Sequence, residues 1–216
     1  MLVAFVCALA QLSSAPGAPP PGAIVLFDGK DTSAWVHRGS GEPVKWDVVD
    51  GALVVKAGTP DIQTVRTFGD YRLHIEFQLP LMPDAKDQGR ANSGVYNQGR
   101  YEIQVLDSYN NPTYKFGGCG AIYGQKDPDT DAIVPPGWWN TYDILYRAPR
   151  FDAAGAVTEK PRISVWHNGI RIHRDVELQG NATTSGIEGP PVAKGPILLQ
   201  NHGAPVHYRN IWIVEM

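Results

Sequence analysis

Short apolar runs broken by turn-forming residues dominate this sequence from Ile24 onward. The 23 Gly and 18 Pro residues, together with Asn and Asp, separate nearly every run from the next. No stretch of a dozen residues free of Gly and Pro carries the i, i+3, i+4, i+7 apolar stripe of an amphipathic helix. The chain therefore cannot fold as a helical bundle, and short β-strands are the expected elements.

The apolar runs are rich in Val, Ile, Tyr, Trp and Phe, which are residues typical of strands. Asn168-Gly169, between two such runs, predicts a type I′ hairpin because both residues tolerate a positive φ. The even spacing is typical of a sandwich, so we predict an all-β single domain of two antiparallel sheets. Strands are expected at residues 44–49, 52–56, 71–79, 94–96, 101–106, 139–147, 162–167, 170–176, 196–200 and 208–215.

Composition excludes several classes of partner. The net charge is -3, only 19% of residues are charged, and no basic run occurs, so nothing predicts binding to nucleic acid or an anionic membrane. A hydrophobic content of 43% is sufficient for a folded core. After the first twenty residues no apolar stretch reaches the roughly 18–20 residues needed for a membrane span.

The N-terminal segment is typical of an export signal. Residues 2–12 form an apolar run of h-region length, and Ser13-Ser14-Ala15 is a small-residue cleavage site. We predict a signal peptide over residues 1–15, with cleavage as late as 18 as an alternative, a Pro-rich lead-in over 16–23, and the folded domain over 24–216. A secreted or periplasmic protein is expected; a buried N-terminal strand or helix is the other interpretation. Removal of the signal leaves Cys119 alone, which excludes an internal disulfide.

Three runs carry polar pairs on one face, because side chains alternate along a strand. Glu76 lies with His74 and Gln78, opposite Leu73, Ile75 and Phe77. Glu102 and Gln104 share a face opposite Ile103 and Val105, and Gln200 and His202 are also two residues apart. As neighbours in one sheet these pairs would line a polar hollow, whereas an ordinary solvated sheet face is the simpler interpretation.

Aromatic and acidic residues suggest two further sites. Trp139 lies next to Trp138 and before Asn140, a combination that suits sugar stacking, although most Trp residues in sandwiches belong to the core. Asp127, Asp129 and Asp131 alternate in a pattern that calcium could use, but they lack the remaining ligands of an EF-hand loop and also fit a solvated turn. No Cys/His spacing predicts zinc.

Several motifs in order resemble one protein family. They are LFDGKDTSAW (26–35), ANSGVYNQGRYEIQVLDSY (91–109), CGAIYGQKDP (119–128), PPGWWNTYDILYRAPRFD (135–152), WHNG (166–169) and GPILLQNHGAPVHYRNIWI (195–213). Together they resemble the 3-keto-disaccharide hydrolase domain family, also described as 3-keto-glycoside 1,2-lyase/hydratase. The resemblance implies a concanavalin A-like, glucanase-type jelly-roll sandwich, export by a bacterium, and a small carbohydrate substrate oxidised to a ketone at C3.

Such a substrate implies its own chemistry. The C3 ketone acidifies the C2 proton, so a base forms an enolate, the glycosidic oxygen leaves C1, and water then adds across the double bond. This reaction needs a base near C2, a donor at the ketone oxygen and an acid for the leaving group.

We expect Glu102 and His202 to be the acid/base pair and Arg209 to stabilise the enolate or to clamp hydroxyl groups. The residues expected to bind the sugar are Asn92, Gln104, Asp107, Tyr123, Gln200, Glu76 and Trp139. No cofactor is required on this interpretation, although a divalent cation at the ketone oxygen is compatible with it.

Two alternatives remain open at this stage. A retaining laminarinase-type glycosidase carries E-x-D-x-x-E on one strand, and the comparable residues here are Glu102, Gln104 and Asp107. Glu102 and Asp107 would need a bulge between them to converge. The other alternative is a carbohydrate-binding module without catalysis, because a fold alone does not define a function.

Overall fold

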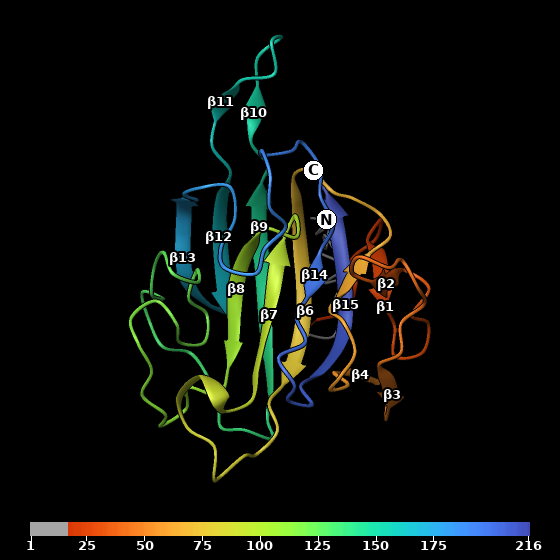
Figure 1. Ribbon diagram of the computed structural model, residues 1–216, viewed down its shortest axis with the longest axis vertical. Coiled ribbons are helices and arrows are strands. Elements are labelled where there is room, and N and C mark those ends of the chain that lie inside the picture. The colour runs from red at the N-terminus through yellow and green to blue at the C-terminus, as the bar shows by residue number, and fades with distance from the viewer. Residues whose placement is uncertain (1–16) are drawn as a thin grey trace, which may run out of the picture.

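The computed structural model describes residues 17–216 as two stacked antiparallel sheets with one short 3-10 turn, η1 (Asp87–Gly89) (Figure 1). The predicted antiparallel β-sandwich is therefore confirmed. The predicted signal peptide, residues 1–15, lies outside the described residues. Within residues 17–216, no helix has the length and apolar character required to cross a membrane.

The large sheet has the strand order β13-β12-β9-β6-β15-β4-β3, and β1 also pairs with β15. Its strands are β1 (Ile24–Phe27), β3 (Asp47–Val49), β4 (Ala52–Val54), β6 (Tyr71–Gln78), β9 (Trp139–Arg147), β12 (Arg162–His167), β13 (Ile170–Glu177) and β15 (His207–Glu215).

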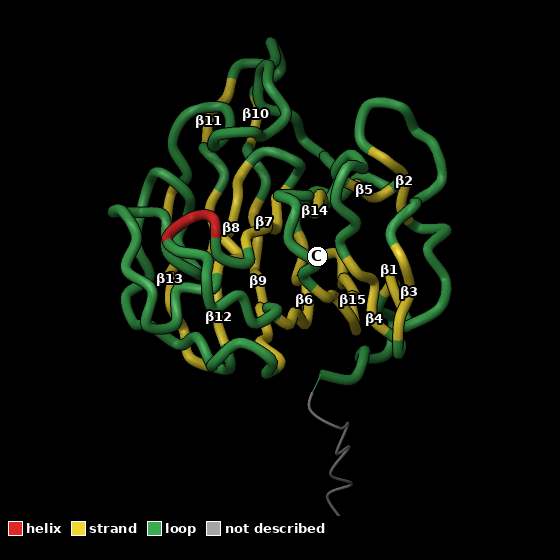
Figure 2. The backbone as a smooth tube through the Cα atoms, turned by 60° about the horizontal axis from the view of Figure 1, so that its bottom comes forward, coloured by secondary structure: helices red, strands yellow, loops and turns green. Residues whose placement is uncertain are grey.

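The small sheet lies over the large one and has the order β2-β5-β14-β7-β8 (Figures 1 and 2). Its strands are β2 (Trp35–His37), β5 (Ile62–Thr64), β14 (Leu198–Leu199), β7 (Asn92–Asn97) and β8 (Tyr101–Leu106). A separate hairpin of β10 (Arg150–Phe151) and β11 (Val157–Glu159) projects from the top of Figure 1.

The core fills the space between the sheets. Ile75 and Phe77 of the large sheet and Ile103 and Val105 of the small sheet are fully buried in it, as alternation predicts. Burial of these side chains in an apolar interior provides most of the stabilisation. Their neighbours along each strand consequently point to the outer surfaces of the sandwich.

The sequence located the long strands and missed five of the short ones. β1, β2, β5, β10 and β11 have two to four residues each, too few to show a period of two. The predicted strand at 196–200 is reduced to Leu198–Leu199, and that at 44–49 to Asp47–Val49. The predicted hairpin is present, with His167 paired to Ile170 and with φ of 50° at Asn168 and 77° at Gly169.

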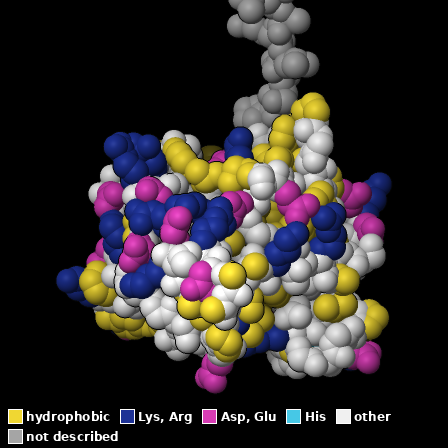
Figure 3. All heavy atoms as spheres, turned by 90° about the horizontal axis from the view of Figure 1, so that it is seen from above, with side chains coloured by type: hydrophobic (Ala, Val, Ile, Leu, Met, Phe, Trp, Pro, Cys, Tyr) yellow, Lys and Arg dark blue, Asp and Glu magenta, His cyan; other side chains and the backbone are white. Residues whose placement is uncertain are grey.

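The surface seen from above carries Lys/Arg and Asp/Glu side chains interspersed with polar groups (Figure 3). This mixture agrees with the composition, which contains no basic run. The view therefore adds no electrostatic feature that would suit a polyanion.

Candidate functional site

A pocket of about 220 Å³ lies on the outer face of the small sheet, where β7, β8 and the residues after β14 meet three loops. It is smaller than the roughly 300–1,000 Å³ of sites for drug-sized ligands, so it suits one small ring. Four larger surface hollows exist in the described part of the chain, but none of them is lined by a histidine together with carboxyl groups and amides. The pocket is lined by Gln88, Asn92, Tyr96, Glu102, Gln104, Tyr114, Tyr123, Thr184, Ser185, Gln200 and His202.

Glu102 is the buried acid of the pocket, with only 2% of its surface exposed. A Cβ atom on Gly94, in the neighbouring strand β7, would lie 2.4 Å from Glu102 Oε1, so the carboxyl group rests on the bare glycine. This contact explains the glycine of the Asn92-Ser93-Gly94 motif. A larger residue there would displace the acid.

The environment of Glu102 favours its protonated form. Burial is the main effect; a hydrogen bond from the Tyr96 hydroxyl to Oε2 (2.8 Å) opposes it, and the charge of Asp61 adds to it. Together these effects raise the pKa of Glu102 to about 8. Glu102 is therefore a carboxylic acid at neutral pH, able to donate a proton.

Side-chain amides surround this acid. Gln104 Nε2 donates to Gln88 Oε1 (3.1 Å), and Gln200 Nε2 donates to the Tyr96 hydroxyl (3.1 Å). The remaining oxygens, Oε1 of Gln104 and Oε1 of Gln200, are buried without a hydrogen-bond partner. Since unpaired buried acceptors are costly, these atoms favour a ligand with hydroxyl donors.

Asn92, at the start of β7, completes the amide wall. Its Nδ2 donates to the main-chain oxygen (2.9 Å) and to Oε1 (3.1 Å) of Gln88, the central residue of η1. The strand and the 3-10 turn are therefore held together at the pocket.

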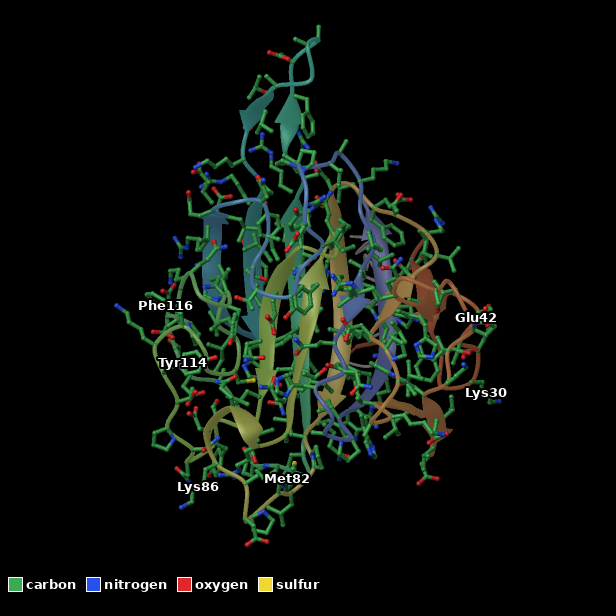
Figure 4. All side chains as sticks on the ribbon, in the orientation of Figure 1. Lys30, Glu42, Met82, Lys86, Tyr114 and Phe116 are labelled. Atoms are coloured by element: carbon green, nitrogen blue, oxygen red, sulfur yellow. The ribbon has the colours of Figure 1, made fainter. Side chains whose placement is uncertain are left out.

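Two tyrosines form the opposite wall. Tyr114 and Tyr123 come from the long segment after β8, and their hydroxyl groups are hydrogen-bonded to each other. Figure 4 shows Tyr114 on this segment, which extends beyond β8, the edge strand of the small sheet. Burial and the Tyr114 hydroxyl raise the pKa of Tyr123, so Tyr123 stays protonated and able to donate.

His202 lies at the rim, exposed to solvent, three residues after β14. The main-chain nitrogen before it, that of Asn201, donates to Asp61 Oδ1 (2.8 Å). The imidazole therefore sits on an anchored loop and lines the same pocket as the buried acid, which is an arrangement capable of acid/base chemistry.

Six of the ten residues expected from the sequence thus line this one pocket. They are Asn92, Glu102, Gln104, Tyr123, Gln200 and His202. The sequence analysis missed Gln88, Tyr96, Tyr114, Thr184 and Ser185. Alternation could have identified Tyr96, because it shares a face with Asn92 and Gly94; the others lie on loops without such a signal.

Glu76, Trp139 and Arg209 do not belong to the pocket, and the expectation for them is corrected. They lie in β6, β9 and β15 of the large sheet, with side chains on its outer face. Arg209 Nε donates to Glu76 Oε2 (2.7 Å), and its guanidinium lies 3.8 Å from the centre of the Trp139 ring. Alternation correctly predicts that these side chains point away from the core, but their strands belong to the large sheet and not to the sheet that carries the pocket.

Asp107 is also absent from the pocket lining. It is fully buried just after β8, where its carboxylate accepts a hydrogen bond from Arg90 Nε (2.7 Å) and another from the Tyr109 main-chain nitrogen (3.3 Å). Its role is to hold these loops in place.

The suggested calcium ligands do not converge. Asp127 accepts from the Phe116 main-chain nitrogen (2.7 Å), Asp129 pairs with Lys126, and Asp131 accepts from the Ile133 nitrogen (3.2 Å). Across residues 17–216, no group of three or more His, Cys, Asp or Glu side chains is arranged to hold a metal ion.

Comparisons with known proteins identify the family of this chain. The model of the 3-keto-alpha-glucoside-1,2-lyase-like domain family matches residues 22–214. A crystal structure of a candidate glycosyl hydrolase from Parabacteroides distasonis is 45% identical, with a TM-score of 0.83 over 91% of this chain and 85% of that chain.

More distant structures share the fold. A second candidate glycosyl hydrolase from Parabacteroides distasonis is 22% identical, with a TM-score of 0.66 over 90% of this chain and 94% of that one. The alginate lyase Aly36B is 10% identical, with a TM-score of 0.50 over 92% and 98%. No curated protein matches the chain significantly.

Proposed function

Because this chain belongs to the 3-keto-alpha-glucoside-1,2-lyase-like domain family, we propose that it is a carbohydrate-active enzyme that cleaves 3-keto-glycosides. The observation that carries this proposal is the buried carboxyl group of Glu102 in one pocket with two buried amide oxygens that lack hydrogen-bond donors. A sugar ring would supply those donors.

In the proposed reaction, His202 removes the proton from C2 and the electron pair of the C2–H bond forms the enolate of the C3 ketone. The enolate then expels the glycosidic oxygen from C1, and that oxygen takes the proton of Glu102. Water next adds across the C1–C2 double bond, with oxygen joining C1 and hydrogen joining C2, so the sum is hydrolysis. Each proton transfer uses a group lining the pocket.

The ketone oxygen needs a donor while negative charge develops on it. Arg209 cannot supply it from the other sheet. We assign this role to the Tyr123 hydroxyl, which is protonated and lines the pocket. Gln104 and Gln200 would accept hydroxyl protons and orient the ring.

A retaining glycosidase is disfavoured by the strand geometry. The pairing of β7 with β8 runs without a register shift from Asn92↔Leu106 to Asn97↔Tyr101, so no bulge brings Asp107 towards Glu102. A second carboxylate about 5–5.5 Å from the first, which that mechanism requires, is therefore not supplied by Asp107.

The test is a product screen by mass spectrometry with matched 3-keto and unoxidised glycosides. Wild type should release product only from the ketone, and Glu102→Gln and His202→Ala should each reduce turnover by about a thousandfold, or about 4 kcal/mol. Glu76→Gln, which changes a carboxylate on the opposite face, is the control and should retain turnover. Cleavage of the unoxidised sugar would instead support a glycosidase, and binding without product would support a carbohydrate-binding module.

A further inference from the structure

Asp61, just before β5, connects two loops that border the pocket. Its Oδ1 accepts a hydrogen bond from the Asn201 main-chain nitrogen (2.8 Å), and its Oδ2 pairs with Arg38 Nη1 (3.1 Å). The first contact holds the segment that continues into His202. Asn201 is also anchored through its side chain, whose Nδ2 donates to the main-chain oxygens of Lys56 and Thr59 (both 2.7 Å).

Arg38 extends the connection to the second loop. Its Nη1 donates to the Ser185 oxygen (2.7 Å) and its Nη2 to the Gly186 oxygen (3.3 Å). Thr184 and Ser185 of this loop line the pocket, and Asp61 and Arg38 border the adjoining hollow. A single ion pair therefore fixes segments that are far apart in the sequence.

We propose that Asp61 is a positioning residue of the active site, which fixes the loop of His202 directly and the loop of Thr184 and Ser185 through Arg38. This inference rests on the proposed function for its catalytic consequence. Asp61 itself takes no part in the proposed proton transfers, because it does not line the pocket.

The charge of Asp61 has a second consequence. The titratable groups around Glu102 are Tyr96 on β7, Tyr208 on β15, Tyr114 and Tyr123 on the facing segment, Asp61 and the rim residue His202. Asp61 is the negative charge that opposes ionisation of Glu102, in addition to the larger effect of burial. The carboxylate of Asp61, which fixes the loops, thus also favours the proton on the acid.

Two variants separate these effects. Asp61→Asn keeps an oxygen for the Asn201 nitrogen but removes the charge, whereas Asp61→Ala removes both. Carbon-13 titration of the Glu102 carboxyl should show a lower midpoint in Asp61→Asn than in wild type, and the alkaline fall of kcat/KM should move to lower pH with it. Asp61→Ala should also lower kcat by about 10- to 100-fold, since misplacing a reacting group is costly.

Asp70 offers a matched control. Its side chain is 19% exposed, as is that of Asp61; it pairs with Arg150 and accepts from the Ala148 main-chain nitrogen (2.8 Å), but it does not line the pocket. Asp70→Asn and Asp70→Ala should lower the melting temperature while leaving the Glu102 midpoint and kcat/KM unchanged.

The proposal is overturned if Asp61→Asn leaves the Glu102 midpoint at its wild-type value and the His202 ring signals of Asp61→Ala match those of wild type. Both readouts are spectroscopic, so they decide the role of Asp61 even if wild type turns over no 3-keto-glycoside. Lack of turnover would count against the proposed function alone.

Discussion

Glu102 and Glu76 look equivalent in the sequence and differ in chemistry. Each is followed two residues later by Gln and points away from the core of the sandwich. Glu102 lies in the pocket of the small sheet with a pKa raised to about 8, whereas the pKa of Glu76, on the outer face of the large sheet, is lowered to about 2. Alternation determines which way a side chain points and leaves its charge undetermined.

The difference arises from their partners. Burial opposes ionisation of both groups, but at Glu76 it is outweighed by the hydrogen bonds from Asn210 and Arg209 and by the nearby imidazole of His74 (3.7 Å). Glu102 has a tyrosine hydroxyl and, as its charged neighbour, Asp61. A carboxylate compensated by cations is a structural ion pair, whereas one left without a cation is a proton donor near neutral pH.

Gly94→Ala would alter the chemistry of Glu102 most strongly. The new methyl group would lie 2.4 Å from Oε1, so the carboxyl must leave its position. We expect a 100- to 1,000-fold fall in kcat/KM, about 3–4 kcal/mol, in the 3-keto-glycoside assay.

Gly89→Ala is the control for this change, because a Cβ atom at Gly89 meets nothing within 4 Å. Its kcat/KM should stay near that of wild type. Equal activity in the two variants would show that the position of Glu102 is unimportant for turnover.

The two carboxylates should also have opposite effects on stability, measured by denaturant unfolding of Glu102→Gln and Glu76→Gln at pH 5 and pH 7. Because folding raises the pKa of Glu102, the folded protein loses stability as the carboxyl group ionises in the unfolded chain. This loss is small below the unfolded pKa of about 4.5 and grows with pH until about pH 8. Glu102→Gln should therefore gain about 2 kcal/mol relative to wild type between pH 5 and pH 7.

Glu76 has a lowered pKa, so its stabilisation is present above about pH 4.5 and is lost as the pH falls towards about 2. Glu76→Gln should be less stable than wild type at both pH 5 and pH 7. If Glu102→Gln and Glu76→Gln changed the free energy of unfolding in the same direction between pH 5 and pH 7, the contrast between the two environments would be wrong.

The contrast between Glu102 and Glu76 also shows how much of the fold and of the pocket the sequence could predict. Period-two alternation identified the polar faces of β6 and β8, and six expected residues do line one pocket. It could not determine that β6 pairs with β15 and β9 while β8 pairs with β7, because long-range pairing depends on packing of the whole core. Loop residues such as Tyr114 and Ser185 reach the pocket through tertiary contacts that no local pattern records.

The Arg209-Asn210-Ile211 motif shows the same limit. β15 shifts register against β6 between Arg209 and Trp212, and Asn210 has a φ of 47°, as expected of a β-bulge. The bulge directs Asn210 Nδ2 to Glu76 Oε1 (2.8 Å) and to the Gly17 oxygen (2.6 Å). The motif therefore joins the segment before β1 to the large sheet.

Asn210→Gly tests the structural role of this motif and has the smallest expected effect on the protein. Glycine keeps the left-handed backbone but removes both hydrogen bonds, so unfolding should become easier by about 1 kcal/mol. Trp212 Nε1 donates to the same Gly17 oxygen (2.9 Å), and its proton should exchange faster in the variant. Asp50→Gly, at another left-handed position (φ 49°) on an exposed turn, is the control and should change neither quantity. Because the pocket lies on the other sheet, kcat/KM should be unchanged; a fall would mean that the outer face of the large sheet contributes to turnover after all.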